Sequence, residues 1–157
     1  MGVVARSSLD PRLISVNPPG WMRDGEFPFI LTTGRVLEHY NCGTMTRRTG
    51  NARIVTEDLL AIHPADAARK GIADGDTVRV FSVRGEVRMR AKLSEEVKPG
   101  ILYTTFHFPE HLVNVVTSSE CDEDTMCPEY KVVAVDVERV SAPVQMKGVK
   151  PGAVAAK

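Results

Sequence analysis

One run of eight residues alternates strictly between charged and apolar side chains, and it constrains the fold more than any other feature of the chain. The apolar members occupy every second position: Val87, Met89, Ala91 and Leu93. The charged members lie between them: Glu86, Arg88, Arg90 and Lys92. Because successive side chains of a β-strand point to opposite faces, the run predicts a strand with one buried face and one solvent-exposed face.

Local signals predict four more strands and one short helix. Apolar, β-prone runs cover residues 29–33, 77–83, 101–106 and 131–137, and Arg84-Gly85 predicts a tight turn before the alternating strand. Residues 63–71 predict a helix, since Pro64 suits its first position and Gly71 suits the position just past its end. Several short strands with a small helix are typical of a β-barrel, and the helix permits some parallel pairing.

The chain of 157 residues is expected to hold one compact domain over residues 27–140. Residues 1–26 are punctuated by Asp10-Pro11, Pro18-Pro19-Gly20 and Asp24-Gly25, which predicts an extended lead-in arm. Residues 141–157, with two prolines and two glycines, predict a flexible tail.

Charge and composition exclude several function classes. Twenty basic and 20 acidic side chains give zero net charge, which argues against a general nucleic-acid-binding surface, and the Arg47-Arg48 pair is expected on the solvated surface. No apolar run approaches the roughly 18 residues of a transmembrane helix, so no membrane contact is expected. The three cysteines fit reduced thiols of a cytoplasmic protein better than a disulfide framework or a metal site. Nucleophile, phosphate-loop and iron–sulfur motifs are missing, so no catalytic and no metal-binding residue is predicted.

The stretch from Thr32 to Arg48, after the first predicted strand, is dense in hydrogen-bonding groups and poor in core residues. Gly34 and Gly43 permit close approach of the backbone to a ligand. Arginine and histidine in this stretch suit a flat, polar, phosphate-bearing ligand. Composition alone favours the alternative, a polar surface loop with capping threonines.

Two later stretches carry a weaker signal of the same kind. Phe106 and Phe108 are able to stack on a ring or to fill the core, and Asn114 lies among apolar residues. His107 and His111 have the spacing of a zinc helix, but Pro109 between them argues against one. Lys131 opens a valine-rich strand, after an acidic loop at 120–124 that is expected to be a solvated face or to orient a partner.

In this order, the three stretches resemble the molybdopterin-dinucleotide-binding domain at the C-terminus of the dimethyl-sulfoxide-reductase superfamily. Formate dehydrogenase catalytic subunits are the most similar branch, and periplasmic nitrate reductases come next. The matching segments are residues 31–40, 43–48, 63–67, 75–78, 84–86, 106–108, 114–117 and 128–131. Each motif is weak alone, but their order and spacing across residues 27–140 are specific.

The resemblance implies a mainly β fold, a six-stranded double-psi β-barrel with short helices, also known as the aspartate-decarboxylase-like barrel. It also implies binding of the bis(molybdopterin guanine dinucleotide) cofactor of molybdenum or tungsten. The residues that it places at this cofactor are Thr33, Gly34, Arg35, Val36, Leu37, Glu38, His39, Tyr40, Asn41, Cys42, Thr44, Phe106, Asn114 and Lys131.

Residue type then gives each of these positions an expected role. Groups near Gly34, Asn41 and Thr44 satisfy pterin edges, and His39 hydrogen-bonds the pterin or its neighbouring phosphate. Arg35 and Lys131 adjust the charge near the pterin, while Phe106 packs on a ring face.

The resemblance further implies a part of a larger oxidoreductase, most similar to formate dehydrogenase, which converts formate to CO2. The metal-ligand and iron–sulfur domains of that enzyme are the expected partners, and the isolated chain is expected to be inactive. It is then either the C-terminal domain or a separate small subunit. Two alternatives stay open: a double-psi barrel that serves as an interaction module without cofactor, and a small metal or thiol redox protein using Cys42, Cys121 and Cys127.

Overall fold

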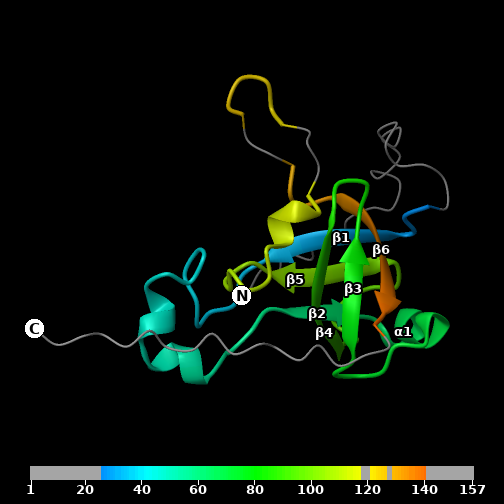
Figure 1. Cartoon of the computed structure of the whole chain (residues 1–157), viewed down its shortest axis with the longest axis horizontal. Coiled ribbons are helices and arrows are strands. Elements are labelled where there is room, and N and C mark those ends of the chain that lie inside the picture. The colour runs from blue at the N-terminus through cyan, green and yellow to red at the C-terminus, as the bar shows by residue number, and fades with distance from the viewer. Residues whose placement is uncertain (1–25, 118–120, 127–128, 141–157) are drawn as a thin grey trace, which may run out of the picture.

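A computed structural model describes residues 26–117, 121–126 and 129–140 of the chain (Figure 1). Its strands are β1 (Phe29–Gly34), β2 (Leu59–Ile62), β3 (Thr77–Phe81), β4 (Glu86–Leu93), β5 (Ile101–Thr105) and β6 (Val133–Arg139). Its helices are α1 (Pro64–Lys70) and the 3-10 helices η2 (Thr46–Arg48), η3 (Gly50–Arg53) and η4 (Val113–Val115). The predicted arm and tail fall almost entirely outside the described residues, so these domain limits stay predictions.

The strands close into a barrel in the order β1-β5-β2-β4-β3-β6. Two of the strand pairs are parallel, β1 with β5 and β2 with β4, and the other four are antiparallel. As a result β5 lies between the consecutive strands β1 and β2, and β2 lies between the consecutive strands β4 and β5. Two interlocked psi motifs of this kind define the double-psi barrel, so the predicted fold is confirmed.

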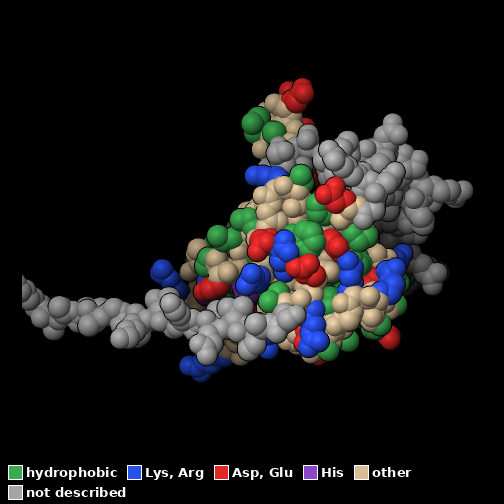
Figure 2. Space-filling view, turned by 45° about the vertical axis from the view of Figure 1, so that its right-hand side comes forward, with side chains coloured by type: hydrophobic (Ala, Val, Ile, Leu, Met, Phe, Trp, Pro, Cys, Tyr) green, Lys and Arg blue, Asp and Glu red, His purple; other side chains and the backbone are tan. Residues whose placement is uncertain are grey.

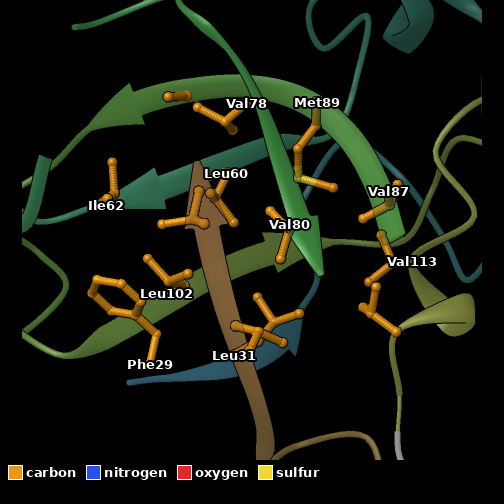
Figure 3. Close-up of a cluster of buried hydrophobic side chains, with 14 of the residues drawn as sticks. Phe29, Leu31, Leu60, Ile62, Val78, Val80, Val87, Met89, Leu102 and Val113 are labelled. Carbon is orange, nitrogen blue, oxygen red and sulfur yellow. The ribbon is translucent and has the colours of Figure 1, made fainter. Parts of the chain in front are cut away.

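The alternating run forms β4 as predicted. Val87, Met89 and Ala91 are buried, whereas Arg88 and Arg90 face solvent. Figure 3 shows Val87 and Met89 within the apolar core, together with side chains from β1, β2, β3 and β5. Val113 of η4 and Val116, which follows it, belong to the same cluster, so buried side chains anchor the segment after β5 to the barrel.

The predicted helix is also confirmed, with both of its ends formed as expected. Pro64 occupies the first turn of α1, and Gly71 ends the helix with a left-handed φ of 64°. The His63 side chain caps the start, because its Nδ1 accepts a hydrogen bond of 3.1 Å from the Ala65 N–H. Asp66, which is fully buried, accepts a hydrogen bond of 2.6 Å from the Gly100 N–H and so fixes the helix to the turn before β5.

Several predicted boundaries were wrong. β3 ends at Phe81 rather than Val83, because Ser82 to Gly85 form the hairpin loop, closed by a 2.9 Å bond from the Ser82 N–H to the Gly85 carbonyl. β5 ends at Thr105, before Phe106, and β6 covers 133–139 instead of 131–137. β2 was not predicted at all, since four consecutive apolar residues show no alternation.

No helix in the described part of the chain has the length and apolar character needed to cross a membrane.

Candidate functional site

A cleft lies where two parallel neighbouring strands end together. Gly34, the last residue of β1, pairs with Thr105, the last residue of β5. The segments that follow both strands therefore leave the barrel at the same edge and enclose a cleft of about 590 Å³. We call residues 42–48 the first wall and residues 106–114 the second wall. The volume is in the range of small-molecule sites, which are concave, partly apolar and lined by a few polar groups.

Four of the residues predicted from the sequence line this cleft. Cys42 and Thr44 belong to the first wall, and Phe106 and Asn114 belong to the second. Asn114 is exposed on η4, so its amide is available to a ligand. Arg35 joins the group through Phe106, because its guanidinium carbon lies 5.9 Å from the centre of that ring.

Thr33 and Lys131 form a separate contact beside the end of β1. The Thr33 hydroxyl donates to the Tyr130 carbonyl at 3.0 Å, and the Lys131 ammonium donates to the Thr33 carbonyl at 2.5 Å. These bonds tie β1 to the segment that precedes β6. Neither side chain is among those that line the cleft, so their contact with a cofactor stays a prediction.

Gly34 allows an aromatic ring to lie directly on the backbone. A Cβ atom at this position would overlap the Tyr103 side chain, whose hydroxyl donates to the Arg35 carbonyl at 3.2 Å. Burial raises the pKa of the Tyr103 phenol above its ordinary value of 10.0, which keeps this donor protonated. The ring thereby fixes the start of the loop that leads to the first wall.

His39 is placed behind the cleft and is satisfied by the chain itself. It is buried, its Nδ1 lies 3.0 Å from the Thr46 hydroxyl, and its Nε2 lies 2.9 Å from the Val55 carbonyl. The carbonyl can only accept, so Nε2 carries the proton and Nδ1 accepts from Thr46. Both ring nitrogens thus hold the loop together, and the expected bond from His39 to the cofactor stays a prediction.

The remaining predicted residues form the loop between β1 and the first wall. Val36 is half-buried, whereas Leu37, Tyr40 and Asn41 are exposed. The Glu38 carbonyl accepts a 2.7 Å bond from the Asn51 side-chain amide, which joins the loop to η3. This loop shapes the first wall mainly through its backbone.

Sequence reasoning missed the arginines of the cleft and part of its aromatic lining. Arg47 and Arg48, expected as a solvated pair, both line the cleft, and the Arg47 guanidinium carbon lies 4.9 Å from the centre of the Phe108 ring. Four rings contact one another in series, at tilted or edge-on angles: Phe106 to His107 at 5.4 Å, His107 to His39 at 5.6 Å and His39 to Phe108 at 5.1 Å. The motif Phe106-His107-Phe108 was the available signal for this series of rings, but the sequence did not indicate how the rings are oriented.

The Molydopterin dinucleotide binding domain family matches residues 29–134, which include strands β1 to β5, the start of β6 and both walls of the cleft. The chain belongs to this family. The predicted resemblance is therefore confirmed, and the barrel is a molybdopterin-dinucleotide-binding domain. This finding does not favour the alternative of an interaction module without cofactor.

Curated relatives of this domain are much longer proteins. An F420-dependent formate dehydrogenase subunit alpha from Methanocaldococcus jannaschii is 45% identical over 118 residues, which cover 74% of this chain and 18% of the relative. Formate dehydrogenase 1 subunit alpha from Methanococcus maripaludis, also F420-dependent, is 42% identical over 123 residues, 78% of this chain and 18% of that subunit. A nitrate reductase from Symbiobacterium thermophilum is 40% identical over 126 residues, 77% and 17% of the two chains. The chain thus spans about a fifth of the length of these relatives.

Among solved structures, acetylene hydratase from Pelobacter acetylenicus superposes with a TM-score of 0.64 at 16% identity, over 73% of this chain and 19% of that one. This likeness extends to the fold alone.

Cys42 and Cys121 are exposed free thiols, and Cys127 lies outside the described residues. The described residues contain no group of three histidine, cysteine or acidic side chains placed to hold a metal ion.

Acidification is expected to open the ion pair that links the two walls of this domain. The Arg47 guanidinium lies 2.6 Å from the Glu110 carboxylate. Burial raises the pKa of Glu110, but bonds from its own backbone amide and from Arg47, with the charges of Arg47 and His111, outweigh this and lower the pKa below 4.5. The pair's contribution is therefore complete above the ordinary glutamate value and is lost as the pH falls through the lowered one. Since both side chains are partly exposed, the effect on stability is small.

A carboxyl-resolved NMR titration measures this pKa directly. We expect the Glu110 midpoint below 4.5 in the unchanged chain and a higher midpoint in Arg47→Ala, which lacks the partner. A midpoint that Arg47→Ala leaves unchanged would contradict the assigned cause.

Proposed function

We propose that the cleft holds part of the bis(molybdopterin guanine dinucleotide) cofactor, with its phosphates near Arg47 and Arg48 and a flat ring against Phe106. In this proposal the metal and the electron transfer are the cofactor's, and the chain's residues bind and orient it. Cys42, Thr44 and Asn114 supply the polar groups around the ring. The roles of Arg35, His39 and Lys131 at the cofactor are part of the same proposal.

The pairing of the arginines carries this proposal. On the barrel surface arginines meet carboxylates: Arg79 pairs with Glu86 and Glu138, Arg90 with Glu57, and Arg139 with Asp76. Figure 2 shows acidic and basic side chains interspersed on one such face. Near the cleft, by contrast, neither Arg35 nor Arg48 has a carboxylate partner within the described residues. Positive charge that the chain leaves uncompensated beside a concave site favours an anionic ligand such as a phosphate.

The lining of the cleft fits the rest of such a ligand. Phe106 and Phe108 offer aromatic surface for a heterocycle. The backbone at Gly43 approaches the second wall closely, since a Cβ there would lie only 2.6 Å from the His107 carbonyl oxygen. Aromatic surface, short polar groups and Arg48, which has no carboxylate partner within the described residues, together support a nucleotide-bearing pterin over a purely apolar ligand.

We further propose that the domain works as the C-terminal domain or small subunit of a larger oxidoreductase, with formate oxidation to CO2 as its activity. The formate dehydrogenase relatives support this, and they are longer than this chain. The segment between β1 and β2 carries four exposed apolar side chains: Leu37, Tyr40, Met45 and Ile54. Such a group favours contact with another domain, and the metal-ligand and iron–sulfur domains of the enzyme are the proposed partners. A cytoplasmic location stays part of this proposal.

GDP, which carries the guanine and the two phosphates of the cofactor, is a direct probe of the cleft. We expect calorimetric binding to the chain at low salt, and Arg48→Ala should weaken it about tenfold, because a hydrogen bond to a charged group contributes about 1.5–3 kcal/mol. A second readout is the pterin fluorescence released by acid and iodine from the protein as purified.

Arg69→Ala is the matched control, since Arg69 is an exposed arginine on α1 and is not among the residues that line the cleft. Its affinity for GDP should equal that of the unchanged chain. Equal affinities of Arg48→Ala and Arg69→Ala, or the absence of GDP binding altogether, would contradict the proposed site.

A further inference from the structure

A completely buried carboxylate lies at the base of the second wall. Asp58, just before β2, accepts hydrogen bonds at Oδ1 from the Thr105 hydroxyl and, at 3.1 Å, from the His107 N–H. Its Oδ2 accepts a 2.9 Å bond from the Phe108 N–H. A buried charge is tolerated only where such partners satisfy it. Asp58 thereby fixes the backbone where the second wall leaves β5.

His107 continues this arrangement to the other side of the cleft. The ring is fully buried; its Nε2 accepts a 3.1 Å bond from the Val36 N–H, and its Nδ1 contacts the Asn41 carbonyl. Because Val36 donates to Nε2, the proton is on Nδ1, which donates to Asn41. The backbone of His107 thus belongs to the second wall, while its side chain holds the loop that leads into the first.

We propose that Asp58 and His107 are positioning residues that set the separation of the two walls, so that ligand affinity depends on two side chains that do not line the cleft. The effect of these two residues on ligand affinity rests on the proposed function, whereas their effect on the separation of the walls does not.

The alternative link between the walls is weak by comparison. The Arg47–Glu110 pair is half-exposed, and ion pairs of this kind contribute little because water screens them. The bonds of Asp58 are buried, and a donor left unpaired beside this carboxylate loses its full solvation. The bonds of His107 join a fully buried ring to the half-buried Val36 N–H and to the Asn41 carbonyl. We therefore expect these bonds to govern the width of the cleft.

Two substitutions at His107 separate its two bonds. An asparagine amide reaches as far as the Nδ1 position, so His107→Asn retains the bond to Asn41 and loses the acceptor for Val36. A glutamine amide reaches as far as Nε2, so His107→Gln retains the acceptor and loses the bond to Asn41. By hydrogen exchange, the Val36 amide should exchange about tenfold faster in His107→Asn. The Gly43 amide of the first wall, which donates to the Tyr40 carbonyl, should exchange faster in His107→Gln.

Affinity for GDP gives the second readout. His107→Gln loses the bond to Asn41, the residue just before Cys42 of the first wall, and should weaken GDP binding about tenfold. His107→Asn retains that bond and should weaken GDP binding less. Asp58→Asn, which keeps the size of the side chain but removes one acceptor, should also weaken binding. Ile72→Val, a conservative change in the core, controls for a general loss of stability and should alter neither binding nor wall exchange.

Equal effects of His107→Asn and His107→Gln on both readouts would overturn the proposal, because a role in packing alone does not distinguish the two bonds. Walls that loosen while GDP affinity stays unchanged would overturn it as well. If the unchanged chain binds no GDP, the proposed function fails, and the exchange rates of Val36 and Gly43 still decide whether His107 holds the walls.

Discussion

Gly43→Ala is expected to weaken GDP binding severely while the barrel stays folded. Gly43 has a φ of +70°, a conformation that costs a residue with a side chain about 1–2 kcal/mol. The added Cβ would also lie 2.6 Å from the His107 carbonyl oxygen, a backbone atom that no rotamer change removes. The first wall must therefore move away from the second. We expect affinity to fall by about a hundredfold or more, equivalent to about 2.7 kcal/mol.

Gly50→Ala is the matched control for this change. Gly50 lies in the same segment between β1 and β2, but a Cβ there meets nothing within 4 Å, and its φ is outside the left-handed region. Calorimetry with GDP should give wild-type affinity for Gly50→Ala, and circular dichroism should show both variants folded. Wild-type affinity in Gly43→Ala would show that the close approach of the walls is irrelevant to binding.

The parts of the fold that the sequence predicted are those that depend on neighbouring residues. The alternation in β4 follows from the pleat of a single strand, and the ends of α1 follow from Pro64 and Gly71. β2 escaped prediction because four apolar residues in a row fit a buried strand and a buried helix segment equally well. The double-psi fold came from the resemblance, since no local pattern specifies that β1 pairs with β5.

In the candidate site, too, neighbouring residues predicted some features and only the fold creates the others. Polar residues of the loop after β1 were found by composition, but the cleft exists only because Gly34 and Thr105 end adjacent parallel strands. Asp58 drew no prediction from the sequence, and His107 was considered for a zinc site with His111, which Pro109 argued against, but not for a role in holding the loop. Their bonds join residues 47 to 71 positions apart, and only the folded barrel brings those residues together. Whether Arg48 has a carboxylate partner is likewise a property of the fold, which is why the Arg47-Arg48 pair was expected at the solvated surface.

Leu31→Ala is expected to lower the free energy of unfolding by about 3–5 kcal/mol, the cost of removing a leucine from a closed core. Leu31 is 1% exposed on β1, where it pairs with both β5 and β6 (Figure 3). That loss is a large share of the total stability of a small domain, which is about 5–15 kcal/mol.

Leu37→Ala makes the same chemical change at a fully exposed position and should alter the free energy of unfolding by less than about 0.5 kcal/mol. Urea denaturation followed by circular dichroism measures both variants, and equal destabilisation would contradict the assigned core.

At low temperature, where Leu31→Ala remains folded, its GDP affinity should match the unchanged chain, because none of the bonds that hold the walls involves this side chain. Leu31→Ala would then lose stability without losing affinity, and Gly43→Ala would lose affinity without unfolding, since the barrel supplies stability and the two walls supply the binding site.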